Sequence, residues 1–324
     1  KYIEDVKDSF EKDKMKEEFD RTMKFVKKQY NSFTLENEMK PDAILGSSAK
    51  LISVADAKKK GYYIPAGYTE STVPELAFTT VDKSLEAAKN NGLKMRAHTL
   101  VWHSQTPSWF FTKNYDGSKV VTPAVMDARL DFYIHNVMGH VMDKEKALTG
   151  SAGSIVYAWD VVNEYLHRPS FAFFKTWTSV YGDMGNSPSY VKKAFEIAYD
   201  MLKSYQATDK VTLFYNDYNT YFGVKDTLNL VEFINKGETA KICGGIGMQS
   251  HVDVKVPTVA IGLLSFYAKI AEANPSLEIH LEYLPVEYER AFRPIFEALT
   301  AAMLSTLPAN LHICMKPMQI RQNS

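Results

Sequence analysis

The chain has 324 residues, of which 45% are hydrophobic and 23% charged, a composition that permits a large buried core and excludes a disordered protein. Its 38 basic and 38 acidic residues cancel, so no net field favours nucleic acid or an anionic membrane. The two cysteines exclude a disulfide framework and a four-cysteine zinc site. No apolar run is long enough to span a bilayer. We therefore expect a globular, soluble protein with a neutral ligand.

The first 30 residues carry apolar side chains among dense charge, mostly at the three-and-four spacing of an amphipathic helix. A short strand over 32–35 then leads to Glu36, Asn37 and Lys40, a polar group that fits either a site or a solvated turn. Residues 43–80 are rich in Gly, Ser, Thr and Pro, which predicts an insertion on a loop, not a linker.

A strand with an unusual end follows a helix predicted over 81–90. The sequence KMRAHTLVWHSQTPSWF places His98, Trp102, His103 and Trp109 around this strand end. A single buried histidine is commonly a core residue, but two histidines and two tryptophans within twelve residues indicate a site. The spacing of the histidines fits neither a helical HExxH motif nor a zinc finger, so we predict no metal.

Beyond residue 120, strands alternate with long amphipathic helices. The stretch IVYAWDVVNE is a run of strand-forming residues that stops at Asn163 and Glu164. Strands alternating with helices predict parallel βαβ units, and polar groups at successive strand ends favour a closed barrel over a doubly wound sheet. We expect one domain over 1–324, with further helices at 127–145, 190–205, 259–273 and 288–303 and further strands at 211–215, 245–248 and 277–284.

The chemistry of these strand ends is narrowed by what the sequence lacks. It contains no nucleotide-binding glycine loop, phosphate loop, GxSxG elbow or CxxC pair. Carboxylates surrounded by Asn, Gln, His, Lys and Trp remain. This inventory suits glycoside hydrolysis, in which one carboxyl group protonates the leaving oxygen and a second attacks the anomeric carbon. Glu164 is the natural candidate for the proton donor.

The motifs ENEMKPD, HTLVWHSQTPSWF, WDVVNE, LFYNDYN and GIGMQSH occur in the order and spacing of glycoside hydrolase family 10. The sequence resembles this family of retaining endo-β-1,4-xylanases well from about residue 30 to 255. The resemblance implies a (β/α)8 TIM barrel, and no metal or organic cofactor. It also implies that Glu164 is the acid/base and that Asn163 bonds the 2-hydroxyl of the sugar being cleaved.

The resemblance assigns further side chains to the substrate cleft. Asp160 and Trp109 are interpreted as structural. Gln249 and His251 would hold the nucleophile and its sugar, and Asn216 and Tyr218 would contact the other side of the cleavage point. The non-reducing side of the cleft would be lined by Glu36, Asn37, Lys40, His98, Trp102 and, as support for that wall, His103.

The sequence departs from the family where the nucleophile belongs. In place of the family's I-T-E-L-D-like strand it reads EIHLEYLP. Aligned on EIH without a gap, the nucleophile position is Tyr283, whereas a one-residue deletion places Glu282 there. Because a one-residue slip turns a strand side chain to the opposite face, the choice matters. We favour Glu282 as nucleophile; Glu278 lies deeper in the strand.

The two ends of the barrel also differ from the family. The signature of the first strand is missing, because the opening residues are typical of a helix, and the tail after Met303 lacks the family's Trp-Gly strand. Unpaired edges would remain if both strands were absent. Either their sequences are unusual, or segments are missing or misread.

The sequence therefore predicts a secreted, monomeric endo-1,4-β-xylanase that acts on xylan and xylo-oligosaccharides by double displacement. Its partners include neither nucleic acid nor a membrane. Two alternatives stay open at this point: a non-catalytic xylan-binding protein on the same barrel, and a β-1,4-glucanase or mannanase of the same clan. Lys40, His98 and Gln249 favour xylan, because they match the xylanase family in particular.

Overall fold

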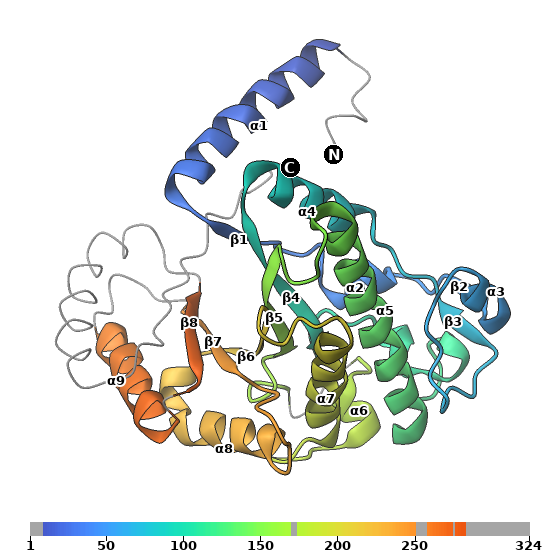
Figure 1. The fold of residues 1–324 in the computed structure, drawn as a ribbon. Coiled ribbons are helices and arrows are strands. Elements are labelled where there is room, and N and C mark those ends of the chain that lie inside the picture. The colour runs from blue at the N-terminus through green and yellow to red at the C-terminus, as the bar shows by residue number, and fades with distance from the viewer. Residues whose placement is uncertain (1–8, 170–173, 251–257, 275, 283–324) are drawn as a thin grey trace.

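A curled parallel sheet forms the centre of the molecule (Figure 1). In this computed structural model the described residues are 9–169, 174–250, 258–274 and 276–282. Within them the strand order is β1-β4-β5-β6-β7-β8, and each neighbouring pair is parallel. The carboxyl ends of all six strands therefore lie at one edge of the sheet. The strands are β1 (Ser32–Thr34), β4 (Lys94–Trp102), β5 (Val156–Asn163), β6 (Thr212–Tyr218), β7 (Gly245–Gln249) and β8 (Glu278–Glu282).

Helices connect these strands and cover the flank of the sheet (Figure 1). Four predicted helices are confirmed, as α4, α5, α7 and α9, whereas the helix predicted at 288–303 lies outside the described residues. No described helix is long and apolar enough to cross a membrane. The longer helices are α1 (Ser9–Gln29), α4 (Thr79–Asn91), α5 (Pro123–Thr149), α7 (Ser189–Ser204), α8 (Val224–Asn235) and α9 (Thr258–Ala273), and the short ones are α2 (Pro41–Leu45), α3 (Val54–Lys59) and α6 (Trp177–Tyr181).

The first helix lies at the surface of the molecule. It confirms the amphipathic helix predicted near the start of the chain, and it projects away from the sheet (Figure 1). None of its residues is buried, and Phe10, Phe19 and Phe25 are exposed. Residues 1–8 and the tail after 282 lie outside the described residues, so the predicted weakness of the barrel's first and last strands stays a prediction.

A buried carboxylate, that of Glu145, holds the amino end of the central strand β5. Strand β5 is rich in β-branched and aromatic residues, and apart from Tyr157 all of its side chains are buried. Glu145, on α5, accepts hydrogen bonds from the backbone N–H groups of Gly153 (2.8 Å), Ile155 (2.7 Å) and Val156 (2.6 Å). These bonds satisfy backbone donors that would otherwise be buried without partners. They fix where β5 begins, and hence where it ends.

Two strands run further than the sequence indicated. Strand β6 was expected over 211–215 but continues to Tyr218, and β7 continues to Gln249. The reason is their mutual register, since Asn216 pairs with Gly247 and Tyr218 with Gln249. Polar side chains expected just beyond the strands therefore lie within them. Their positions are set by backbone hydrogen bonds and not by loops.

The predicted insertion at 43–80 contains elements of its own. Strands β2 (Leu51–Ser53) and β3 (Thr72–Pro74) pair antiparallel, and helix α3 follows β2 directly. Ser53 caps that helix, because its Oγ accepts the backbone N–H of Asp56 at 3.0 Å. Local caps and a small sheet thus give order to a segment whose composition indicates a loop.

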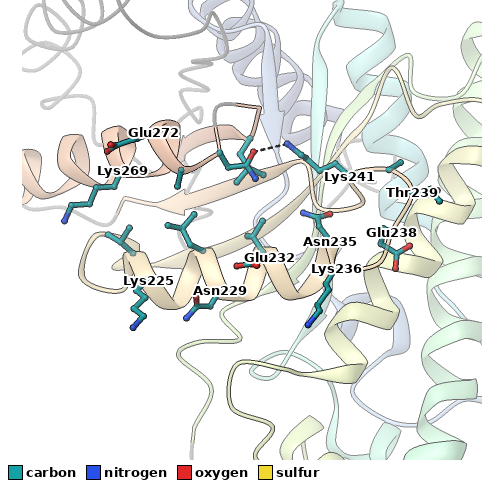
Figure 2. A pocket seen from close by; sticks show the side chains of 17 residues that line it. Lys225, Asn229, Glu232, Asn235, Lys236, Glu238, Thr239, Lys241, Lys269 and Glu272 are labelled. Carbon is teal, nitrogen blue, oxygen red and sulfur yellow. Dashed lines mark hydrogen bonds between the residues drawn. The ribbon is translucent and has the colours of Figure 1, made fainter.

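A hollow lies between α8, α9 and the loop that follows α8 (Figure 2). Its labelled side chains carry charges of both signs, and Lys241 donates a hydrogen bond to Asn274 at 3.1 Å. The site residues taken from the sequence do not line it. Because positive and negative side chains both line this hollow, its charge favours neither an anion nor a cation.

Candidate active site

Glu164 stands directly after β5 and is held from two sides. Trp102, the last residue of β4, donates its Nε1–H to Glu164 Oε2 at 2.8 Å, and Gln249, the last residue of β7, donates Nε2–H to Oε1 at 2.9 Å. The backbone of Glu164 is left-handed, with φ of 58°. This conformation is unfavourable for a residue with a Cβ and persists where its surroundings enforce it. The strand ends thus fix one carboxyl group in a defined orientation.

Neutral amides surround this carboxyl group. Asn163 Oδ1 accepts hydrogen bonds from Gln249 Nε2 at 2.9 Å and from Asn216 Nδ2 at 3.0 Å. All three amide side chains are buried. Strands β5, β6 and β7 each contribute one of them, so the cluster exists only when these strands are in register.

The segment after β1, which carries Asn37 and Lys40, forms a wall of the site beside Trp102. Lys40 is buried, donates to Asn37 Oδ1 at 3.0 Å, and places its Nζ 5.0 Å from the centroid of the Trp102 ring. Gln105, which was not among the candidates from the sequence, also donates to Asn37 Oδ1, at 3.3 Å. Glu36 is exposed in the same segment. The structure therefore brings Asn37 and Lys40 to the indole that contacts Glu164.

His98 belongs to a buried ionic network within the sheet. It lies in the middle of β4, and not near the strand end as the sequence indicated. Its Nδ1 donates to Asp160 Oδ2 at 2.8 Å, and Arg96 binds the same carboxylate through Nε (3.1 Å) and Nη2. Burial acts to raise the pKa of Asp160, but the charges and hydrogen bonds of Arg96 and His98 outweigh it and hold the pKa well below its usual range.

The same network extends across the sheet to β8. Arg96 Nη1 donates to His280 Nδ1 at 2.8 Å, so the other ring nitrogen of His280 carries a proton toward Glu278, 3.2 Å away. Glu278, at the start of β8, also accepts a hydrogen bond from Thr212 at 2.8 Å. It therefore lies at the edge of the sheet opposite to Glu164. Its place agrees with the expectation that it is too deep to serve as nucleophile.

Further aromatic rings lie near Glu164, whose charge acts on His103, His167 and Tyr218. The His103 ring packs edge-on against Trp102, and burial lowers the pKa of His103 although the charge of Glu164 opposes the change. The Tyr218 ring stacks on His167, with centroids 4.0 Å apart. His167 was not a candidate from the sequence, where its position three residues after Glu164 is the only signal. Trp109 is buried and donates to Gly46 O at 3.2 Å.

The remaining candidates lie at the end of a described segment or outside the described residues. Glu282 is the last residue of β8, and its backbone is in register with Gln249. Its role as nucleophile stays a prediction, as do the roles assigned to the other candidates. His251 and Tyr283 lie outside the described residues. In the part of the chain that is described, no cluster of His, Cys, Asp or Glu could hold a metal ion.

Comparison with known proteins identifies the family. The sequence matches the family described as Glycosyl hydrolase family 10 over residues 2–319. The chain belongs to glycosyl hydrolase family 10. The resemblance found in the motifs is thereby confirmed, and with it the (β/α)8 barrel, of which the described strands form a curled part.

Relatives within family 10 cover much of this chain. Endo-1,4-beta-xylanase A of Butyrivibrio fibrisolvens is 50% identical over 241 residues, which are 74% of this chain and 56% of that protein. Endo-1,4-beta-xylanase A of Thermotoga neapolitana is 35% identical over 270 residues, 82% of this chain and 21% of that protein. The chain thus spans about half the length of the first relative and about a fifth of the second.

Solved structures of the family share the fold. The endo-1,4-beta-xylanase from Caldicellulosiruptor owensensis is 26% identical, with a TM-score of 0.61 over 90% of this chain and 79% of that chain. The CBM22-1 and GH10 modules of xylanase 10B from Clostridium thermocellum superpose with a TM-score of 0.63 over 91% of this chain and 55% of that chain. At 24% identity, this second likeness concerns the fold alone.

Proposed function

We propose that this chain is the catalytic domain of a retaining endo-1,4-β-xylanase. The observation that carries the proposal is the carboxyl group of Glu164, which Trp102 and Gln249 hold beside Asn163 at the carboxyl ends of parallel strands. Active sites of barrel enzymes lie at this edge. The identity to the Butyrivibrio fibrisolvens and Thermotoga neapolitana xylanases supports xylan as the substrate.

The fixed orientation of Glu164 suits a general acid. It would protonate the glycosidic oxygen as the bond to the anomeric carbon breaks, while the nucleophile forms a glycosyl-enzyme. Glu164, now a carboxylate, would then remove a proton from the water that releases the sugar. Asn163, anchored by Gln249 and Asn216, would offer its side-chain amide N–H groups to the 2-hydroxyl of the sugar being cleaved.

We assign the nucleophile to Glu282. Its backbone is in register with Gln249, whose side chain reaches Glu164, so the end of β8 lies beside the strand end that contacts the acid. Retaining glycosidases hold their two carboxyl groups about 5 to 5.5 Å apart. The Asn37–Lys40–Trp102 wall would bind sugars on the non-reducing side, and Tyr218 would contact the leaving sugar.

Two measurements test this assignment. Release of reducing sugar should occur from xylan and not from carboxymethylcellulose or mannan. Incubation with a 2-fluoro xylobioside should add one glycosyl group to the intact mass, and peptide mapping should place it on Glu282. Binding of xylan without turnover, or a label on another glutamate, would contradict the proposal. A Glu164→Gln variant should bind xylotriose but lose about 10²- to 10⁴-fold in kcat, the usual contribution of a general acid.

We also propose that the enzyme works outside the cell, because polymeric xylan does not cross a membrane. We propose further that it acts as a monomer. Fractionation of the producing cells with an antibody to the domain should place it in the medium. Light scattering after size-exclusion chromatography should give the mass of one chain, and a larger mass would refute the monomer.

A further inference from the structure

His167, three residues after Glu164, is held by two neighbouring residues of β6. His167 Nδ1 donates to Asp217 Oδ1 at 2.7 Å, and its ring stacks on Tyr218 at 4.0 Å with the planes 27° apart. Asp217 is fully buried in β6, and it also accepts hydrogen bonds from the Tyr218 backbone N–H at 2.8 Å and from the hydroxyl of Tyr215. One buried carboxylate thus fixes the plane of the imidazole, and the imidazole supports the plane of the Tyr218 ring.

The same network holds the turn that carries Glu164. The Glu164 backbone N–H donates to Asn216 O at 2.8 Å, and the His167 N–H donates to Glu164 O at 3.2 Å. The Leu166 N–H donates to the Tyr215 hydroxyl at 3.0 Å. Glu164, Leu166 and His167 are therefore tied to β6 or to one another. Such ties are what a non-glycine residue with φ of 58° requires, since this conformation is unfavourable and persists only where its surroundings impose it.

We propose that His167 is a positioning residue for the leaving-group side of the site, a role that rests on the proposed xylanase function. Through Asp217 it locks the turn that aims Glu164 at the glycosidic oxygen, and through its ring it holds Tyr218 against the departing sugar. His167 transfers no proton in the reaction. Its contribution is geometric. Replacing His167 should therefore lower kcat/KM for substrates that need both proton donation by Glu164 and a bound leaving sugar.

The charges around His167 agree with this role. The hydrogen bond to Asp217 raises the pKa of His167, burial opposes the change, and the charges of Asp217 and Glu164 add to it. His103 and Arg168 face the same region, and Arg168 is itself paired with Asp183. A raised pKa means that the protonated ring binds Asp217 most strongly. The bond is fully present below the usual pKa of histidine and weakens as pH rises through the raised value.

The test compares two substrates that share the same sugar on the non-reducing side. Xylotetraose needs proton donation and a bound leaving sugar, whereas 2,4-dinitrophenyl xylobioside has a leaving group that departs without an acid. His167→Phe keeps a ring beside Tyr218 and removes the bond to Asp217. We expect kcat/KM for xylotetraose to fall about 10- to 100-fold, as for other small misplacements of a reacting group, and kcat/KM for the aryl xylobioside to change little.

The chain offers a matched control in His140, on α5. Its Nε2 donates to Asp82 at 2.7 Å, its ring stacks on Phe78 at 3.9 Å, and its side chain is 33% exposed, the same fraction as that of His167. It lies on the outer helices. His140→Phe should lower the melting temperature about as much as His167→Phe does, and leave the ratio of the two kcat/KM values unchanged.

Further variants distinguish positioning from a general loss of structure. His167→Asn can place an amide N–H where Nδ1 was, so it should restore part of the xylotetraose activity. In the wild type, kcat/KM for xylotetraose should fall at alkaline pH as His167 loses its proton, and this alkaline limb should shift in His167→Phe. Equal losses on both substrates, or no loss on either, would overturn the role of His167. A wild-type protein inactive on both substrates would instead refute the proposed function, and the inference with it.

Discussion

Replacing Asp160 by Asn tests how much the domain depends on its buried ionic network. Asp160 is fully buried and is bound by His98 at 2.8 Å and by Arg96 through Nε and Nη2. The guanidinium of Arg96 also lies 4.2 Å above the Phe214 ring, away from water. Asp160→Asn keeps the size of the side chain but removes the carboxylate that is paired with this charge. Removing one partner of a buried ion pair costs about 3–5 kcal/mol.

The free energy of unfolding in urea, measured for the wild type and Asp160→Asn, checks this magnitude. The matched control is Glu86→Gln, because Glu86 pairs with Lys144 at 2.6 Å on the surface, where the two side chains are 46% and 25% exposed. An exposed pair contributes at most about 1 kcal/mol. If Asp160→Asn destabilises no more than Glu86→Gln, the network is not the central ionic support of the sheet that its burial indicates.

The stability difference between the wild type and Asp160→Asn should depend on pH. Since the folded pKa of Asp160 is depressed, its contribution is present above the unfolded pKa of an aspartate and is lost as pH falls through the folded value. The wild type should therefore lose stability in acid more steeply than Asp160→Asn. Parallel curves of melting temperature against pH would contradict the depressed pKa.

Further substitutions test the strand ends and the packing beneath them. Glu282→Gln should abolish turnover of xylan with little change in the melting temperature. Glu278→Gln should keep turnover and lose stability, because an amide accepts the hydrogen bonds of Thr212 and His280 less strongly than the carboxylate does. Reducing-sugar assays and thermal melts separate the two variants, and a reversed result would assign the nucleophile to Glu278. Gly245→Ala should lower the free energy of unfolding in urea by about 1–3 kcal/mol, because the added Cβ would overlap the Phe214 ring and overpack the sheet interior. An unchanged urea midpoint would mean that the ring moves freely.

The regular parts of this fold are visible in local sequence patterns. Apolar spacing predicts α5 and α7 because a helix must bury one face, and this requirement acts within a few turns. The abrupt stop of an apolar run at Asn163 predicts in the same way the end of β5, which the structure confirms. The motif resemblance predicts which side chains serve the site. Seven of them lie close to Glu164 or to residues beside it: Asn37, Lys40, Trp102, Asn163, Asn216, Tyr218 and Gln249.

What local patterns missed depends on register and on distant pairing. Strand β6 runs to Tyr218 because β7 lies beside it. The residues around position 215 alone do not reveal this pairing. Arg96 and His280 are 184 residues apart in sequence, yet 2.8 Å separates their nitrogen atoms. His167 has no motif of its own, and its importance appears only when Asp217 and Tyr218 are seen beside it. Side chains that act through a second residue are in general invisible until that residue is placed.

The use of amides around Glu164 has a physical reason. A catalytic acid in a retaining enzyme must carry a proton in the first step and lose it before the second. A lysine or arginine in place of Gln249 would bind the carboxylate strongly and oppose protonation, whereas a further carboxylate would repel it. Amide groups donate hydrogen bonds without a full charge, so they orient Glu164 in both states. The buried ion pair of Arg96 and Asp160 lies deeper in the sheet, where it sets the strand positions and not the protonation of Glu164.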